Sequence, residues 1–223
     1  MTEVPTCRLS FADLRLSPRQ AHYLRGYLGR VFADHSPLLH NHYADGGLRY
    51  GYPLVQYKVL GGVPTLLGLR EGAPLLQTLF LRVRELQLAG TTYPLQHKQL
   101  DTAEAQLGLA DTLITYRFVN PWLGLNEHNY QRYRRASPAE RKALLSRVLT
   151  GNILSFYKGM DLRLAAHERI LVQLQVQEKT IRFKNQPMMG FTGHFTTNAL
   201  LPEDIGLGKA VSRGFGAIQK VST

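Results

Sequence analysis

The first hundred residues alternate between strand-like and helix-like hydrophobic patterns, and this order limits the folds open to the chain. Apolar side chains recur at every second position in strands and at every third or fourth position in helices. A Ser-Pro pair is typical of a helix start, and a Gly-Gly pair between two apolar runs indicates a hairpin. The expected elements are a strand at 7–14, a helix at 17–34, two strands joined across Gly61–Gly62 within 50–69, a helix at 74–86 and an extended segment at 87–95. The order β-α-β-β-α-β is that of a ferredoxin-like domain.

The remaining residues also mix strands and helices, with less regular spacing. A long helical segment with a break near Ser137–Pro138 is followed by two alternating strands around a turn near Asn185. The expected elements are a strand at 111–121, the helical segment at 129–158 and strands at 169–177 and 190–201. No shift in composition marks a boundary, and residue 100, between the two groups of elements, is the expected division.

The net charge indicates the class of partner. Lys and Arg total 27 against 16 Asp and Glu, which gives a net charge of +11, and both halves of the chain are basic. A basic excess spread over a folded body favours a polyanion, most commonly a nucleic acid, although many soluble proteins are basic without such a partner. Six of these cations fall between residues 129 and 147 of the long helical segment, where a solvated helix face and an RNA contact are the two interpretations: Arg132, Arg134, Arg135, Arg141, Lys142 and Arg147.

Composition also excludes several classes of protein. A hydrophobic fraction of 44% is that of a folded chain, and the single cysteine, Cys7, excludes an internal disulfide and a cysteine-based metal site. No window approaches the ~20 apolar residues of a membrane span, and the N-terminus has no signal-peptide pattern. We therefore expect a cytoplasmic protein with no membrane partner.

The segment HNHYADGG, which starts at His40, carries two histidines at alternate positions. In an extended segment, His40 and His42 point to the same side, so both imidazoles could face one group. Three interpretations follow: an acid/base pair, a metal site completed by Asp45, or a surface loop without chemistry. No further cluster of acidic residues or histidines stands nearby in the sequence to complete a nuclease metal centre.

The C-terminal segment GLGKAVSRGFG, residues 206–216, is the most specific motif of the chain. Glycines allow positive φ angles and a close approach of the backbone to phosphates, and Lys209 and Arg213 supply positive charge. The spacing does not fit a P-loop, because Glu203 stands at the first glycine position and Ala210 follows the lysine. A structural glycine turn is the alternative interpretation.

These residues carry a resemblance to a known family. The paired GxG motif after LLPEDIG resembles the glycine-rich loop of the RAMP superfamily. Within that superfamily, VSRGFG at 211–216 and YGYPLVQYK at 50–58 make the chain similar to the CRISPR-associated repeat-RNA endoribonucleases, the Cas6 family. The resemblance implies an α+β fold of two tandem ferredoxin-like (RRM-like) domains. Residues 1–100 would carry the catalytic histidine loop, and residues 101–223 would end in the glycine-rich RNA-binding loop.

The resemblance also implies a reaction. Members of the family cut precursor CRISPR RNA within each repeat without a metal or another cofactor. The 2′-oxygen attacks the adjacent phosphorus and leaves a 2′,3′-cyclic phosphate and a 5′-hydroxyl. The expected partners are CRISPR repeat RNA, as precursor and as mature guide, and beyond it other effector-complex subunits and a second copy of the chain in a homodimer. The alternative is a catalytically inactive RAMP-type RNA-binding subunit of a CRISPR effector complex.

By the same resemblance, His40 and His42 are the candidate catalytic pair, with the acid and base roles unassigned. Tyr50 is the third candidate catalytic residue, and Tyr52 is a second possible source of a phenol. Lys58 either stabilises negative charge or is a solvent-exposed strand lysine. The expected RNA-binding residues are Gly206, Gly208, Lys209, Arg213, Gly214, Gly216, Arg182 and Lys184.

Overall fold

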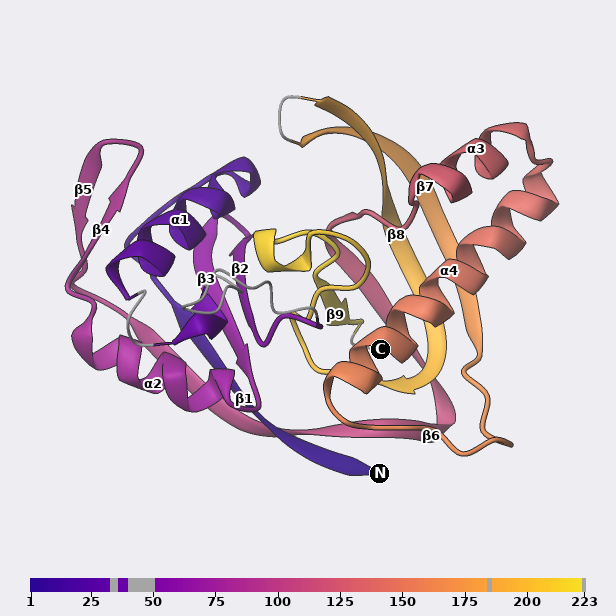
Figure 1. The fold of residues 1–223 in the computed structure, drawn as a ribbon, viewed down its shortest axis with the longest axis horizontal. Helices are drawn as coiled ribbons and strands as arrows, with labels where there is room; N and C mark the ends of the chain where they lie inside the picture. The colour runs from indigo at the N-terminus through magenta and orange to yellow at the C-terminus, as the bar shows by residue number, and fades with distance from the viewer. Residues whose placement is uncertain (33–35, 40–50, 184–185, 222–223) are drawn as a thin grey trace. The chain divides into compact units, whose positions relative to one another are not determined.

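The computed structural model describes residues 1–32, 36–39, 51–183 and 186–221. The chain divides into two compact units (Figure 1). The N-terminal unit consists of Glu3–Ala105 and Val211–Gly214, and the C-terminal unit of Met1–Thr2, Gln106–Ala210 and Phe215–Thr223. A short piece of the glycine-rich segment therefore belongs to the unit built by the other end of the chain.

The N-terminal unit has the expected β-α-β-β-α-β order. Its elements are β1 (Thr2–Ser10), α1 (Ala21–Val31), β2 (Val55–Leu60), β3 (Val63–Leu69), α2 (Gly72–Arg82) and the start of β6 (Gln99–Trp122). The strand order is β2-β3-β1-β6, and β3 pairs antiparallel with both of its neighbours. Each strand therefore has the neighbours that a ferredoxin-like sheet requires, with the first strand between the third and the fourth.

Two expectations for this unit are corrected by the structure. The helix expected at 74–86 ends at Arg82, because Val83 is extended. The segment expected to be extended at 87–95 is instead part of a hairpin, in which β4 (Glu85–Leu88) pairs with β5 (Thr91–Pro94) in a sheet of its own. The turn residues Ala89 and Gly90 have positive φ angles of 51° and 84°, as a tight two-residue hairpin turn requires. The fourth strand of the main sheet is therefore β6.

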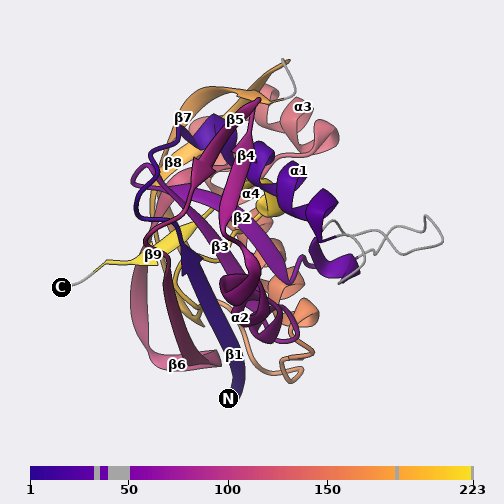
Figure 2. The ribbon, with the colours of Figure 1, turned by 90° about the vertical axis from the view of Figure 1, so that its left-hand side faces the viewer.

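The start and the buried face of α1 follow from its sequence. Ser17 and Gln20 form a capping box on a short 3-10 turn, η1 (Pro18–Gln20), which leads into the helix. Leu24 and Leu28 are fully buried against the sheet, whereas Val31, which continues their helical spacing, is 47% exposed at the last turn. Figure 2 shows α1 and α2 covering the sheet of this unit, with the β4–β5 hairpin beside α1.

The C-terminal unit is a second ferredoxin-like arrangement. It consists of the rest of β6, α3 (Glu127–Arg135), α4 (Pro138–Gly159), β7 (Val172–Phe183), β8 (Gln186–Leu200) and β9 (Ile218–Lys220). The strand order is β7-β8-β6, with β9 pairing antiparallel to the other side of β6. The predicted break between helices is confirmed, because Ser137 caps α4 in a capping box with Glu140. The two tandem domains predicted by the resemblance are thus present, and none of the helices in the described ranges is long and apolar enough to cross a membrane.

One element of the second ferredoxin-like unit is replaced. Where a helix would connect its third and fourth strands, the chain between β8 and β9 has only a 3-10 turn, η3 (Val211–Arg213). Backbone contacts hold the rest of this connection to its own unit: Leu207 N donates to Gly216 O at 3.0 Å, and Gly216 N donates to Pro121 O at 2.9 Å. Gly216 has a φ of +64°, and a Cβ there would lie 2.0 Å from the carbonyl oxygen of Leu207.

We therefore predict that Gly216→Ala destabilises the C-terminal unit by about 2–4 kcal/mol, because it adds both a clash and an unfavourable φ angle. Gly151→Ala is the matched control, since Gly151 lies in α4 and a Cβ there would meet nothing within 4 Å. Alanine should stabilise that helix by up to about 1 kcal/mol. Denaturant unfolding followed by the fluorescence of Trp122, the single tryptophan, measures both. Equal midpoints for the two variants would contradict the structural role of Gly216.

Candidate functional site

The residues assigned to catalysis from the sequence, His40, His42 and Tyr50, lie outside the described residues, and so does Lys184. The described chain reaches this segment at η2 (Pro37–Leu39) and resumes at Gly51. Tyr52 is half-buried, and its hydroxyl accepts a hydrogen bond from Nε2 of Gln56 at 2.9 Å. Within the described ranges, no three His, Cys, Asp or Glu side chains gather as a metal site would require. Asp45, the third ligand of the metal-site interpretation, is outside those ranges.

Tyr57 anchors the chain immediately before His40. It lies on β2, is fully buried, and its hydroxyl donates to the carbonyl oxygen of Leu39 at 2.9 Å. Burial raises the pKa of the Tyr57 phenol, and the nearby charge of Arg25 only partly opposes this shift. The phenol is therefore neutral at physiological pH and keeps its proton for the hydrogen bond. Leu39 is itself only 1% exposed, so the last residue before the histidines is fixed in the N-terminal unit.

The turn η3 packs against β2 and α1, where Figure 1 shows it as a short yellow turn beside β2. Gly214, which follows the turn, has a φ of +90°, and a Cβ there would lie 3.0 Å from the carbonyl oxygen of Tyr57 and 3.4 Å from Cβ of Ala21. A side chain at this position would hold η3 away from the strand. Gly214 thus places Arg213 beside the strand that anchors Leu39.

Arg25 on α1 and Arg213 on η3 bring two positive charges together. Both side chains are half-buried, and Nη1 of Arg25 lies 3.5 Å from Oγ of Ser212, to which it donates. Burial lowers the pKa of Arg25, and the charge of Arg213 lowers it further. Two neighbouring guanidinium groups favour an anion with several oxygens, such as a phosphate.

Arg25 was not among the residues assigned from the sequence. It is one of many arginines on polar helix faces, and no motif distinguishes it. Only the packing of η3 on α1 brings it next to Arg213. The structure excludes one of the two interpretations of Lys58. The residue is fully buried on β2, so it is not a solvent-exposed strand lysine.

The other predicted glycines lie in the C-terminal unit. Gly208 has a φ of +90°, and a Cβ there would lie 2.7 Å from both the carbonyl oxygen of Leu123 and Nε1 of Trp122. Lys209 N donates to the same Leu123 oxygen at 2.9 Å, and the Lys209 side chain is exposed. The close approach expected toward phosphates is therefore made to the protein's own backbone, which accounts for Gly208, Gly214 and Gly216 without a ligand. Gly206 is buried and bridges to Ala217.

A second basic surface lies at the corner between α3 and α4. Arg141 has both hydrogen-bond and ion-pair partners there. Its Nε donates to the carbonyl oxygens of Tyr133 and Ala136 at 3.0 and 3.1 Å, and its Nη1 lies 3.7 Å from Oε1 of Glu178. Arg132, Arg135 and Arg147 instead line a hollow of about 390 Å³ in the same corner. In the described part of the chain these three arginines have no ion-pair partner. Arg182 is also exposed, near the end of β7.

Two family models match the chain. The Cas6b N-terminal domain matches residues 2–106, and the Cas6b C-terminal domain matches residues 108–221. In sequence, an uncharacterized protein of Methanocaldococcus jannaschii is 33% identical over 144 residues, which are 64% of this chain and 97% of that protein.

Solved structures resemble the chain over almost its whole length. A crystal structure of Cas6b aligns with a TM-score of 0.93 and 31% identity, covering 99% of this chain and 100% of that one. A crystal structure of a CRISPR RNA processing endoribonuclease Cas6b aligns with a TM-score of 0.80 and 28% identity, with the same coverage. A type IV Cas6 crRNA endonuclease, at a TM-score of 0.58 and 13% identity, shares the fold.

Proposed function

The chain belongs to the Cas6b family, and from that premise we propose that it is an endoribonuclease that processes precursor CRISPR RNA by cutting within each repeat. The observation that carries the proposal is the match, over 99% of the chain, to a structure described as a CRISPR RNA processing endoribonuclease. The net charge of +11 agrees with an RNA substrate.

The proposed reaction is a transesterification that needs no metal. A base removes the proton of the 2′-hydroxyl, and the 2′-oxygen forms a bond to the adjacent phosphorus. The bond from phosphorus to the 5′-oxygen breaks, and an acid protonates that oxygen. The products are a 2′,3′-cyclic phosphate and a 5′-hydroxyl, and no water is consumed. The protein must supply the base, the acid and stabilisation of the charged phosphorane.

We assign the two proton transfers to His40 and His42, and we keep Tyr50 as a third catalytic residue. An imidazole can take or give a proton near neutral pH, which suits both steps. Arg25 and Arg213 are proposed to bind a phosphate of the RNA close to these histidines, because both lie next to the strand that anchors Leu39. Arg25 thereby extends the set of site residues.

RNA outside the cleavage site would contact the remaining basic residues. Lys209 and Arg182 are exposed cations, and Lys184 follows Arg182 closely in sequence. Gly206, Gly208, Gly214 and Gly216 are proposed to act in RNA binding indirectly, by setting the backbone that presents Lys209 and Arg213. The arginines of the α3–α4 corner supply further positive charge for the sugar–phosphate backbone.

The first prediction from the proposed function concerns the mechanism. The protein should cut its cognate repeat RNA in EDTA, and a single 2′-deoxy nucleotide at the cut should block cleavage. His40→Ala and His42→Ala should each lower the single-turnover rate about 10²- to 10⁴-fold, as expected for loss of a general acid or base. Gel electrophoresis of the products measures the extent and the rate of cleavage in each case. Resistance of the 3′ end to phosphatase identifies the cyclic phosphate.

Each of three other outcomes of that experiment would contradict part of the proposal. Loss of cleavage in EDTA would indicate a metal-dependent nuclease. Tight RNA binding without cleavage would indicate a catalytically inactive RNA-binding subunit. Parental rates in both alanine variants would show that the histidine assignment is wrong.

The second prediction concerns Arg25. Arg25→Gln should lower the single-turnover rate about 10- to 100-fold, because one of two guanidinium groups on the phosphate is lost. Arg25→Lys should restore only part of the rate, since a single ammonium cannot bind a phosphate through two parallel hydrogen bonds. Arg84→Gln, which removes an exposed arginine of the same unit, is the control. If Arg25→Gln and Arg84→Gln cut equally fast, Arg25 has no special place in the reaction.

The third prediction concerns Tyr57 as a positioning residue. Tyr57→Phe removes only the hydroxyl that holds Leu39, so the single-turnover rate at saturating RNA should fall about tenfold while the Kd for RNA is unchanged. Tyr116→Phe is the control, because the Tyr116 hydroxyl also donates to buried backbone carbonyls, those of Ala199 and Leu201 at 3.3 and 3.4 Å. Both variants should lose about 1 kcal/mol of stability. Equal rates in the two variants would mean that Tyr57 contributes to stability alone.

A further inference from the structure

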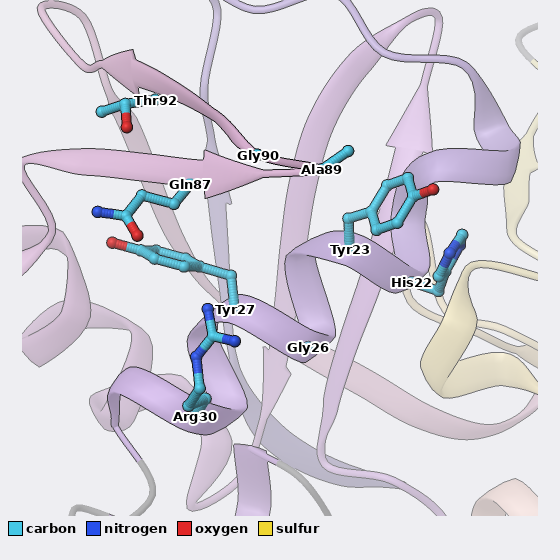
Figure 3. Close-up of a pocket in the computed structure, with 9 residues that line it drawn as sticks. All are labelled: His22, Tyr23, Gly26, Tyr27, Arg30, Gln87, Ala89, Gly90 and Thr92. Atoms are coloured by element: carbon cyan, nitrogen blue, oxygen red, sulfur yellow. The ribbon is translucent and has the colours of Figure 1, made fainter.

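A pocket between α1 and the β4–β5 hairpin is separate from the phosphate site proposed above. It has a volume of about 450 Å³ and lies within the N-terminal unit (Figure 3). The helix contributes His22 and, at the i, i+3, i+4, i+7 spacing of one helix face, Tyr23, Gly26, Tyr27 and Arg30. Arg25 belongs to another face of the same helix, the one that meets η3. One helix thus presents different chemistry on two sides.

Hydrogen bonds join the two sides of the pocket and position one of its lining side chains. Tyr27 is only 8% exposed, and its hydroxyl donates to the carbonyl oxygen of Glu85 on β4 at 3.2 Å, which ties the helix to the hairpin. The carboxylate of Glu85 accepts a hydrogen bond from Nε2 of Gln87 at 2.9 Å, so the Gln87 amide is held in a defined orientation at the pocket wall. A site whose walls are fixed before a ligand arrives loses little conformational entropy on binding.

Gly26 leaves space in this pocket that the protein does not use. Glycine is a poor helix former, yet Gly26 stands in the middle of α1 on its exposed side. A Cβ at this position would meet nothing within 4 Å, and the φ angle is not in the left-handed region. Neither packing nor backbone conformation therefore requires a glycine here. What the glycine does provide is open volume beside the helix, because it has no side chain to fill the pocket.

The side chains around this space match one nucleotide. Tyr23 is 38% exposed; its ring lies against the His22 ring, with centroids 4.1 Å apart, and the exposed part of the ring is the surface on which a base could stack. Arg30 is exposed and, in the parts of the chain that the structure describes, has no carboxylate partner, so it can bind a phosphate. The Gln87 amide and the Thr92 hydroxyl add hydrogen-bonding groups on the hairpin side, as the sticks in Figure 3 show. None of the described residues that line the pocket is acidic.

We propose that this pocket binds one unpaired nucleotide of the RNA, with the base stacked on Tyr23 and a phosphate against Arg30. The proposal rests on the proposed function, since RNA is taken from it as the ligand. An unpaired nucleotide is required because a base within a duplex has no free face to offer an aromatic ring. The pocket would hold the single strand that runs from the cleavage site along α1, and it would add affinity without taking part in proton transfer.

The test uses repeat RNA with single-stranded flanks and a 2′-deoxy nucleotide at the cut, so that binding is measured without cleavage. Gly26→Leu fills the pocket with a better helix former, so we expect the variant to fold at least as stably as the parent. We expect Gly26→Leu and Tyr23→Ala each to raise the Kd by roughly 5- to 100-fold in fluorescence anisotropy, as for loss of one stacked base. Tyr23→Phe, which keeps the ring, should stay within about twofold of the parent.

The control is Gln77→Leu, which places the same side chain on the exposed face of α2 in the same unit and should leave the Kd unchanged. Photocrosslinking with 4-thiouridine in the flanks should identify the peptide that contains Tyr23. Parental affinity in Gly26→Leu, or crosslinks that avoid this peptide, would overturn the proposal. If the all-ribose RNA is never cut but Gly26→Leu still weakens binding, the cleavage proposal fails and the nucleotide pocket stands.

Discussion

The close approach of glycine backbone to neighbouring carbonyl groups is the constraint on which the arrangement of the C-terminal segment depends. A complete ferredoxin-like repeat would bury the apolar face of a helix between its third and fourth strands. This chain has no such helix there, so the segment is held instead by backbone contacts at Gly208 and Gly216. These contacts are too short for any side chain. The segment therefore needs no helix to hold it, and Lys209 and Arg213 are presented by a backbone that these contacts keep in place.

A close glycine contact also places η3 on the N-terminal unit. Gly214 lies against the carbonyl oxygen of Tyr57, and the hydroxyl of Tyr57 holds Leu39. One residue of β2 is thereby connected to the turn that carries Arg213 and to the residue before His40. This arrangement explains how two parts of the chain that are far apart in sequence could serve one reaction. The Tyr57 hydroxyl can be fully buried because the carbonyl oxygen of Leu39 accepts its hydrogen bond. Burial in turn raises the pKa of the phenol and keeps it neutral.

Much of the secondary structure could be predicted because its causes are local. The Gly61–Gly62 turn, the capping boxes at Ser17 and Ser137, and the alternation in β7 all depend on neighbouring residues. The β4–β5 hairpin was missed because its turn, Ala89–Gly90, lacks the usual asparagine or aspartate and places an alanine at positive φ. The length of β6, 24 residues, was missed because its side chains alternate between buried and exposed only near its C-terminal end, over residues 116–122.

By itself, the sequence determined the order of the elements, the basic charge and the glycine-rich motif, because composition, periodicity and turn chemistry act over a few residues. It also carried the histidine pair and the resemblance to a family of RNA-cutting enzymes. Only the tertiary structure decided that Arg25 lies near Arg213, that Tyr57 holds Leu39, and that Gly26 opens a pocket beside the hairpin. Each of these depends on contacts between residues remote along the chain. Such contacts form only when the whole fold buries its apolar surface, so no local pattern could reveal them.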